Sequence, residues 1–576
     1  MGLIDPATLG VLVSKLFWTT EEMNAYLVRS GFSSNIKVRK DCSCALYTKD
    51  GDLLAQGEFI AVHLGVMAQC LKKVLEYHPI NTLEEGDAIL QNDSYNMGSH
   101  LNDFMMFKPL FYEGRIIAFA GNTAHHTDIG AISPDLSARS ILDEGQRIPP
   151  IKIVKRGKVQ EDLIKLIAAN SRTPHEIKGD VMAQIAANFR GEQRLIELAH
   201  KYGANTLLEY FDAILEYSEK GMRKAISDIP DGEASFEDHV EYEGRLVKII
   251  VKLTKKGSDI YLDFTGSGEA TAGSLNAPWS LTHSASYYAI KAVVGPRIPT
   301  NEGAYRTIHL LRPKGDSVLD AQFPRAVGNC TGTPTQRVVD VIIGALSKIV
   351  PEKVSACDGH WPVMKLIGID PKKKRFFAYA ETYACGRGAK HDDDGADGHH
   401  THMTNTENAP AETIELEYPL RVDKYALIPD SGGAGEFRGG LGITREVTSL
   451  VPTSFAVDSQ RPTISPYGLS GGEGGGTDSG GQLLEDSTIA KPRGLLKTGE
   501  RVCIRTSGGG GWGNPLDRPA KKVEWDALNG YISLDAAKNK YGCVISNSGK
   551  VDMEETNKLR ARLKGMQNKR TNLEQE

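Results

Sequence analysis

The first eighty residues alternate between helical and strand-like spacing of their apolar positions. Residues 5–30 follow an Asp-Pro start with an amphipathic stretch, which predicts a helix. Residues 38–48 and 53–56 flank a Lys-Asp-Gly-Asp turn and predict a β-hairpin, with Asp41 inside its first strand. Residues 63–78 return to helical spacing and predict a second helix.

A second hairpin is predicted by two apolar runs, residues 104–111 and 115–121, which a Glu-Gly turn separates. Histidine and carboxylate side chains border both ends of this hairpin. They are His100 and Asp103 before the first run, and His125, His126 and Asp128 after the second. Because a hairpin returns its far end to its start, we expect the two clusters to lie side by side.

The rest of the chain predicts helices first and strands afterwards. Residues 129–160 are rich in Gly, Ser and Pro and predict a surface loop, while residues 162–228 predict one or two long helices. Short antiparallel strands, two helices, a glycine-rich strand-like segment and a charged helical tail follow. The strands are predicted at residues 234–242, 246–254 and 260–264, the helices at 280–294 and 335–349, the glycine-rich segment at 375–515 and the tail at 521–564.

These elements predict a mixed α+β, multi-domain protein, because 576 residues are too many for a single core. Mixed sheets and long helices are expected in the N-terminal half, and a glycine-rich, strand-rich part at the C-terminus. The predicted segments are a metal-binding domain, an α+β middle domain, a β-rich domain and the tail. Their boundaries are residues 1–230, 231–374, 375–520 and 521–576.

Composition and charge argue against several classes of protein. The net charge is −5, and no basic stripe with interleaved aromatic residues suggests a nucleic-acid partner. No apolar run approaches the ~18 residues of a membrane span, and the N-terminus lacks a signal-peptide pattern. The eight cysteines are scattered and form no disulfide framework. We therefore expect a cytoplasmic protein with neither nucleic-acid nor membrane partners.

The clusters around the second hairpin are the main candidate for chemistry. A shell of two imidazoles and up to two carboxylates suits Zn, Mn or Fe(II), and water on such an ion ionises near neutral pH and hydrolyses carbonyl compounds. The candidate ligands are His100, Asp103, His125 and Asp41. His126 and Asp128 are then residues that orient the ligands, or the general base. Spacing does not rank His125 against His126, and a hydrogen-bonded polar corner is the alternative to a metal site.

Two further clusters are interpreted as structural. Residues 391–402 contain four histidines and four aspartates, but irregular spacing and two glycines favour a flexible, substrate- or interface-facing loop over a metal box. Cys42 and Cys44 lie on one face of a predicted strand and are interpreted as small buried residues rather than as a metal pair.

Motifs across residues 5–517 resemble the hydantoinase B family in order and spacing. The family includes B subunits of ATP-dependent N-methylhydantoinase and caprolactamase. The C-terminal part of 5-oxoprolinase is similar, as are subunits of acetone and acetophenone carboxylases. The motifs are Arg39-Lys40-Asp41-Cys42-Ser43-Cys44-Ala45-Leu46, Ala55-Gln56-Gly57, Asn92-Asp93-Ser94-Tyr95, His100-Leu101-Asn102-Asp103, His125-His126-Thr127-Asp128-Ile129-Gly130, Thr335-Gln336-Arg337-Val338-Val339-Asp340-Val341, Asp430-Ser431-Gly432-Gly433-Ala434-Gly435, Arg438-Gly439-Gly440-Leu441-Gly442 and Gly508-Gly509-Gly510-Gly511-Trp512-Gly513-Asn514-Pro515.

The resemblance implies a ligand set and a partner. In the family, an Asp of the first hairpin, the His-x-x-Asp pair and the first histidine of the later cluster hold the metal. Carried over, the ligands are Asp41, His100, Asp103 and His125. His126 and Asp128 remain the catalytic candidates because they neighbour these ligands in the sequence. The implied ion is divalent, zinc first and manganese as the alternative. The implied partner is a hydantoinase A-type subunit that binds ATP and Mg, in an α2β2 hetero-oligomer.

The function predicted on this basis is that of the metal-bearing beta subunit of an ATP-dependent cyclic amide hydrolase. The partner would phosphorylate a lactam, hydantoin or 5-oxoproline-like ring, and metal-bound hydroxide would then attack the activated carbon. Two alternatives stay open. The chain is then either a subunit of a biotin-independent, ATP-dependent ketone carboxylase or a non-catalytic partner of an A-type subunit.

Overall fold

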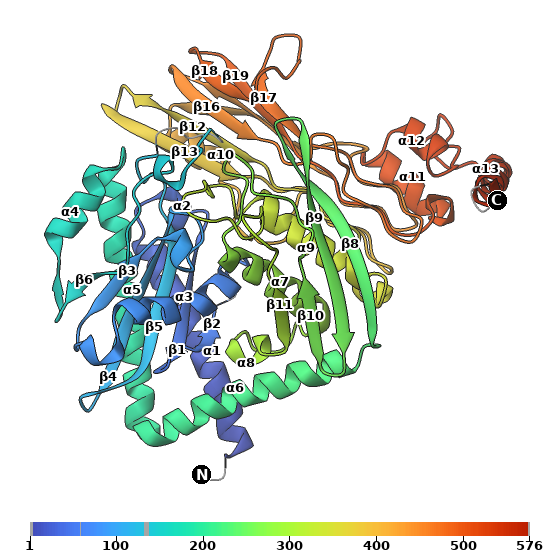
Figure 1. Ribbon diagram of the computed structural model, residues 1–576. Helices are drawn as coiled ribbons and strands as arrows, with labels where there is room; N and C mark the ends of the chain where they lie inside the picture. The colour runs from blue at the N-terminus through green and yellow to red at the C-terminus, as the bar shows by residue number, and fades with distance from the viewer. Residues whose placement is uncertain (1–3, 58, 132–136, 574–576) are drawn as a thin grey trace. The chain divides into compact units, whose positions relative to one another are not determined.

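The computed structural model describes residues 4–57, 59–131 and 137–573, which form two compact units. Unit 1 comprises Met1–Val350, Lys365–Ala380 and His402–Ala409, and unit 2 comprises Pro351–Met364, Glu381–Thr401 and Pro410–Glu576. Several separate sheets alternate with long helices, so the predicted mixed α+β, multi-domain class is confirmed (Figure 1). The predicted boundaries near residues 230, 374 and 520 remain predictions. In the described part of the chain, none of the helices is both long and apolar enough to span a bilayer.

Unit 1 is built on a seven-stranded antiparallel sheet with the strand order β2-β1-β5-β4-β3-β6-β7. Strand β5 pairs with β4 in one hairpin and with β1 on its other side. Both predicted hairpins are therefore confirmed, and they share one sheet. The strands are β1 (Cys42–Thr48), β2 (Leu53–Gln56), β3 (Ala88–Gln91), β4 (Asp103–Tyr112), β5 (Arg115–His125), β6 (Ile151–Lys155) and β7 (Lys158–Val159).

Side chains alternate along each strand and so project from both faces of this sheet. Helices pack on both of these faces. On one face, Cys42 and Cys44 of β1 belong to a core shared with α1 (Pro6–Ser30) and α5 (Pro174–Tyr202). This confirms their interpretation as buried small residues. On the other face, Ser43 hydrogen-bonds a histidine of α3 (His63–Tyr77), and Tyr47 donates to the carbonyl of Met67 in the same helix.

The first strand starts later than the sequence predicts, and Asp41 precedes it. Residues Ser34–Lys37 form a helical turn, α2, whose first turn is capped by the Ser33 hydroxyl. Lys40 then adopts a left-handed backbone with φ of 56°, which a strand does not accept. The predicted strand over residues 38–41 is therefore wrong, and pairing begins at Cys42.

Two other segments differ from the prediction. The expected loop at 129–160 contains a short 3-10 helix, Ile141–Asp143, and the strands β6 and β7, because its isoleucine-rich end extends the sheet beyond β3. The helical stretch at 162–228 contains two long helices, as expected, α5 and α6 (Ala204–Ser227), and in addition a short helix before them, α4 (Glu161–Ala169). Pro174 starts α5, and Gly203, with φ of 82°, separates it from α6.

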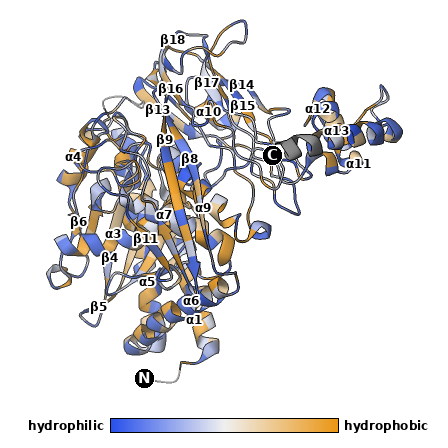
Figure 2. Ribbon diagram, turned by 45° about the vertical axis from the view of Figure 1, so that its right-hand side comes forward, coloured by the Kyte–Doolittle hydropathy of each residue, from blue (hydrophilic) through white to orange (hydrophobic). Residues whose placement is uncertain are grey.

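A second sheet in unit 1 has the order β11-β10-β9-β8, with β10 and β11 parallel and the other pairs antiparallel. Its long β8–β9 hairpin is visible in Figure 1, and Figure 2 shows hydrophobic and hydrophilic residues side by side along α1 and α6. Helix α9 packs on β8 and β9, as well as against α7. The elements are β8 (Gly232–Tyr242), β9 (Arg245–Lys256), β10 (Asp259–Asp263), β11 (Ile308–Leu311), α7 (Trp279–Val294), α8 (Glu302–Tyr305) and α9 (Thr333–Leu346). The next two strands along the chain, β12 (Val363–Asp370) and β13 (Arg375–Thr382), belong to a different sheet.

Unit 2 contains an antiparallel sheet with the order β14-β15-β19-β17 and an antiparallel pair β16–β18. The predicted helical tail consists of three helices, of which α11 and α12 share a small core with Tyr541 and Cys543. The elements are α10 (Ala411–Glu417), β14 (Leu420–Leu427), β15 (Ile443–Ser449), β16 (Thr453–Asp458), β17 (Ser479–Leu483), β18 (Arg493–Leu496), β19 (Arg501–Arg505), α11 (Ala520–Leu528), α12 (Leu534–Asn539) and α13 (Met553–Leu573).

The glycine-rich segments of unit 2 pack backbone against backbone. The amide of Gly509 donates to the carbonyl of Gly440 at 3.0 Å, and the carbonyl of Gly509 accepts from Gly433 at 2.8 Å. A Cβ on Gly509 would lie 2.1 Å from the carbonyl oxygen of Arg387, and one on Gly386 would lie 1.8 Å from that of Gly440. No side chain larger than hydrogen fits such contacts, so these glycines are required by close approach.

We predict that Gly509→Ala lowers the free energy of unfolding by about 3 kcal/mol, because the added methyl group overlaps a carbonyl oxygen. The measurement is thermal or urea denaturation of the full chain. Gly10→Ala is the matched control, since no atom lies within 4 Å of its Cβ position on an exposed turn of α1. That control should gain about 0.5–1 kcal/mol from helix propensity. Equal stability of the two variants would contradict the close-packing interpretation.

Candidate metal centre

The hairpin β4–β5 sets two of the candidate ligands opposite each other. Asp103 is the first residue of β4, His125 is the last residue of β5, and the two are directly paired in the antiparallel register. His100 lies in the loop before β4, after the 3-10 helix Ser94–Asn96. The expected meeting of the two clusters is therefore confirmed.

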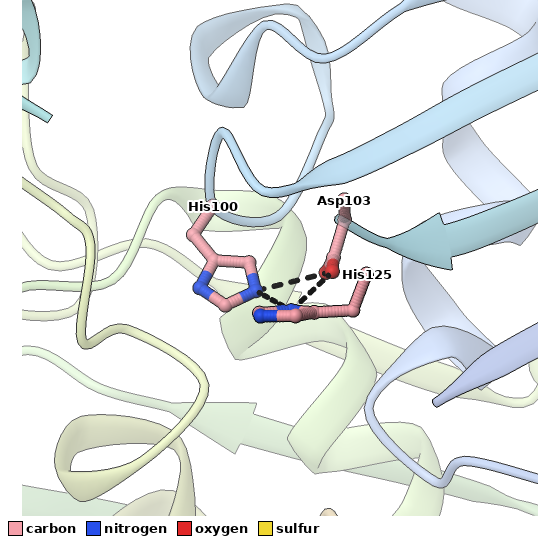
Figure 3. Close-up of side chains that lie close together, drawn as sticks. All are labelled: His100, Asp103 and His125. Carbon is pink, nitrogen blue, oxygen red and sulfur yellow. Dashed lines mark hydrogen bonds and ion pairs between the residues drawn. The ribbon is translucent and has the colours of Figure 1, made fainter. Parts of the chain in front are cut away.

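Three ligand atoms converge at this end of the sheet (Figure 3). The Nε2 atom of His100 lies 3.1 Å from Oδ1 of Asp103 and 3.0 Å from Nδ1 of His125, and that nitrogen is 3.1 Å from the same Oδ1. Ligands at right angles and about 2.1 Å from one ion lie about 3.0 Å apart. The triangle therefore has the size of one face of a divalent-metal coordination shell.

The hydrogen bonds around His100 fit metal ligation. Its Nδ1 faces the carbonyl oxygen of Gly328 at 3.1 Å, so Nδ1 carries the proton and Nε2 presents its lone pair to the triangle. Burial disfavours the charged imidazole, but Asp103, the Gly328 carbonyl and Asp41 together outweigh burial and raise the pKa of His100. Burial likewise opposes ionisation of Asp103, yet the neighbouring histidines hold the pKa of its carboxyl well below the usual range.

The outer carboxylate oxygen of Asp103 has its own partners. The Ser99 hydroxyl donates to Oδ2, and Nε2 of His63 lies 3.7 Å from the same atom. The other ring nitrogen of His63 is 2.9 Å from the hydroxyl of Ser43 on β1. Asp103 is therefore held on its far side while Oδ1 faces the triangle.

Asp41 lies beside the triangle without joining it. Its backbone carbonyl accepts the N–H of His125 at 3.0 Å, and its charge contributes to the raised pKa of His100. Within the described residues, the group whose ligand atoms converge consists of His100, Asp103 and His125. The structure thus places Asp41 next to the centre through its backbone.

His126 points to the opposite face of the sheet from His125. It is fully buried, its ring lies 4.0 Å from that of Phe104, and its Nε2 is 3.1 Å from Oε1 of Gln184 on α5. Burial lowers the pKa of His126. Gln184 also donates to the carbonyl of Phe104 at 2.7 Å, so one amide fixes the residues that follow both Asp103 and His125.

Asp128 is buried in an ion pair with Arg172 and also accepts the Arg172 backbone N–H. Its carboxylate further accepts from the Ser171 hydroxyl at 3.3 Å. These contacts fasten the loop after β5 to the segment before α5. The structure therefore brings Asp128 to Arg172 rather than to the triangle.

Most of the polar cluster at residues 391–402 belongs to unit 2, and there arginines bind two of its aspartates. Asp394 accepts from Arg518 at 2.6 and 2.8 Å, and Asp397 accepts from Arg438 at 2.9 Å. These two carboxylates thus neutralise buried guanidinium groups and take part in structural ion pairs. The interpretation of the cluster as a flexible, substrate- or interface-facing loop remains a prediction.

Sequence reasoning missed the outer supports of the triangle. Glu144 lies in the segment expected to be a loop, and it accepts the N–H groups of Val327 at 3.0 Å and Gly328 at 2.6 Å. Gly328 in turn accepts from His100. Burial raises the pKa of Glu144 to about 7. These contacts join Glu144 to residues 183 and 184 positions away, and no local spacing indicates them.

A family model described as Hydantoinase B/oxoprolinase matches residues 5–515, so the chain belongs to this family. It is 32% identical to the putative D-/L-hydantoinase B subunit of a Pseudomonas species, over 97% of this chain and 98% of that protein. It is also 32% identical to the caprolactamase beta subunit of Pseudomonas jessenii, over 97% and 100% of the two chains.

Solved structures agree with this placement. The crystal structure of the ATP-dependent caprolactamase from Pseudomonas jessenii matches with a TM-score of 0.91 and 30% identity, over 97% of this chain and 100% of that one. An acetone carboxylase structure shares the fold at a TM-score of 0.89 and 19% identity, over 98% and 83% of the chains. The hydantoinase B resemblance is thereby confirmed.

We predict that Glu144→Gln weakens binding of a divalent metal about tenfold, because the amide nitrogen of glutamine cannot accept one of the two backbone N–H groups that place the Gly328 carbonyl. The measurement is Zn²⁺ affinity in competition with a chromophoric chelator. Glu302→Gln is the control, a partly buried glutamate whose partner is Lys72 at 2.9 Å. Unchanged affinity in Glu144→Gln, or an equal loss in the control, would contradict this role.

Proposed function

We propose that this chain is the metal-bearing subunit of an ATP-dependent amidohydrolase that opens cyclic amides. The observation that carries the proposal is the converging His100, Asp103 and His125 in a chain similar over its whole length to caprolactamase and hydantoinase subunits. Zinc is the first candidate ion and manganese the second, since both accept imidazole and carboxylate ligands.

The ligand set accounts for the chemistry asked of the site. A bound divalent ion would supply a Lewis acid that lowers the pKa of a water molecule towards neutrality. His100, Asp103 and His125 would hold it, with Asp41 as a fourth ligand after a change of its side-chain position. The proton on Nδ1 of His100, fixed by Gly328, keeps Nε2 available, and Ser99 and His63 keep Asp103 in one orientation.

An unstrained amide resists hydrolysis because resonance stabilises its C–N bond. ATP dependence of the related caprolactamase fits prior phosphorylation of the amide oxygen, which makes the ring carbon electrophilic. We assign that step to a partner, an A-type subunit that binds ATP and Mg, in an α2β2 assembly. Because the two Pseudomonas relatives are named as a B subunit and a beta subunit, they support a two-subunit enzyme.

We assign His126 and Asp128 to positioning rather than to proton transfer. His126 faces α5 on the other side of the sheet, and Asp128 is paired with Arg172. Both contacts fix the backbone that follows the end of β5. Their substitution should therefore act through the placement of His125.

The second candidate is an ATP-dependent ketone carboxylase subunit, favoured by the shared fold with acetone carboxylase. The third candidate is a non-catalytic scaffold. Incorporation of labelled bicarbonate into ketones distinguishes the carboxylase from an enzyme that opens lactam rings. Stoichiometric metal separates an enzyme subunit from a scaffold.

We predict that Asp103→Ala removes the metal, because it leaves two neutral imidazoles and lowers the negative charge at the site by one unit. His100→Ala and His125→Ala should lose it as well, whereas His126→Ala should retain it. The measurement is metal per chain by elemental analysis. Retention in the His125 variant together with loss in the His126 variant would overturn the ligand assignment.

We predict ring opening by the co-expressed two-subunit complex coupled one-to-one to ATP consumption, and none by this chain alone. The measurement is simultaneous assay of ring-opened product and ADP with a panel of lactams, hydantoins and 5-oxoproline. Ring opening without ATP would rule out the activated-amide mechanism. Turnover by the isolated chain would rule out the division between two subunits.

A further inference from the structure

Helix α9 begins with an N-terminus that lacks a side-chain cap. Gly332 occupies the cap position and Pro334 has no N–H, so the first turn offers the N–H groups of Thr333 and Thr335 without intrahelical acceptors. Gln336 is the first residue to bond back, to the carbonyl of Gly332 at 3.1 Å. The positive end of the helix dipole therefore lies here with free donor capacity.

Two side chains of the same turn are buried without hydrogen-bond partners among the described residues. The hydroxyl of Thr333 and both amide atoms of Gln336 make no hydrogen bond there, although these residues are 1% and 0% exposed. Side chains of a helix lean towards its N-terminus, so both project over the first turn. The hydroxyl of Thr335, by contrast, donates to the carbonyls of Cys330 and Thr331 at 2.9 and 2.8 Å.

Leaving such groups unpaired costs stability, so their concentration at one helix end indicates a missing ligand. An uncapped helix N-terminus is a binding site for anions, and phosphate groups are among the anions held this way. The turn offers two backbone N–H groups, one hydroxyl and one amide NH₂ as hydrogen-bond donors. The three oxygens of a phosphoryl group can accept hydrogen bonds from all of them. A neutral ligand would leave the dipole uncompensated.

The first turn of α9 follows shortly, in the sequence, after a residue that contacts the candidate metal centre. Gly328 binds His100, and two successive tight turns, Val327 to Cys330 and Asn329 to Gly332, lead from there into α9. Gly328 and Asn329 are partly exposed, so the loop is not sealed from solvent. Asp103 and Glu144 act electrostatically on Cys330, and a bound divalent cation would offset these negative charges.

We propose that the first turn of α9, through Thr333, Thr335 and Gln336, binds the phosphoryl group of the activated amide. The assignment rests on the proposed function and extends it to the part of the substrate that leaves. It also gives a role to the Thr335-Gln336-Arg337 motif. Arg337 itself bonds the carbonyl of His239 and the carboxylate of Asp340, so recognition falls to the uncharged donors.

The first test uses inorganic phosphate and the full-length chain in its metal-loaded form. Isothermal titration should show saturable binding that Thr333→Val weakens about tenfold, the loss of one hydrogen bond to a charged group. Gln336→Glu should abolish binding, because it adds a negative charge at the same shape. Thr307→Val is the control, a buried threonine whose hydroxyl already donates to the carbonyl of Ala304.

Metal content and the circular dichroism spectrum are measured for every variant, and a variant that does not fold is replaced by Gln336→Leu. If the wild-type chain holds metal but phosphate does not bind, or binds all folded variants equally, this inference fails and the proposed function stands. If the wild-type chain holds no metal, the proposed function fails first.

The second test separates the activated substrate from released phosphate as the occupant, using the co-expressed complex. If the turn holds the activated amide, Gln336→Glu should lower ring opening at least tenfold while ATP hydrolysis continues uncoupled. A different result would overturn the assignment to the activated substrate: Gln336→Glu opens the ring at the wild-type rate and is no longer inhibited by added phosphate. The turn would then be a site for the released phosphate.

Discussion

The direct pairing of Asp103 with His125 across the β4–β5 hairpin is the constraint on which the candidate centre depends. A shift of one residue would turn one of these side chains to the α5 face, where Phe104 and His126 now lie. The pairing is held from behind by Gln184, whose amide spans both strands. The ligand triangle is therefore a property of strand register, and α5 maintains that register.

Supports for the three ligands come from different parts of unit 1. Ser99 and His63 hold the outer oxygen of Asp103, while Glu144 holds the loop whose carbonyl orients His100. Charges so deeply buried are costly unless they are compensated. His100, His125 and His63 all act on the one carboxylate of Asp103, which explains why its pKa stays low in a buried setting.

Local patterns in the sequence predicted much of the fold and of the candidate centre, but such patterns contain no information about contacts between distant segments. Period-two and helical spacing gave both hairpins, α1, α3 and α7, because each depends on neighbours along the chain. The start of β1 was predicted too early because the left-handed Lys40 has no signature in spacing. The separation of His125 from His126 required the resemblance, since alternation assigns them to opposite faces without saying which face carries the metal. Glu144 and Gln184 became visible only through contacts between distant segments, and the turn at Thr333 only through buried side chains that lack partners among the described residues.

The glycine-rich segments of unit 2 have a consequence for how the backbone exchanges with solvent. Residues 508–511 belong to no helix or strand, yet their amides donate to the carbonyls of Gly476, Gly440, Cys357 and Glu473. Amide hydrogens in irregular segments ordinarily exchange with water quickly, whereas protection follows hydrogen bonding and burial. These four glycines are buried as well, so this stretch should retain its hydrogens as long as the neighbouring strands do. A chain segment without side chains thus behaves as part of the rigid interior of its unit.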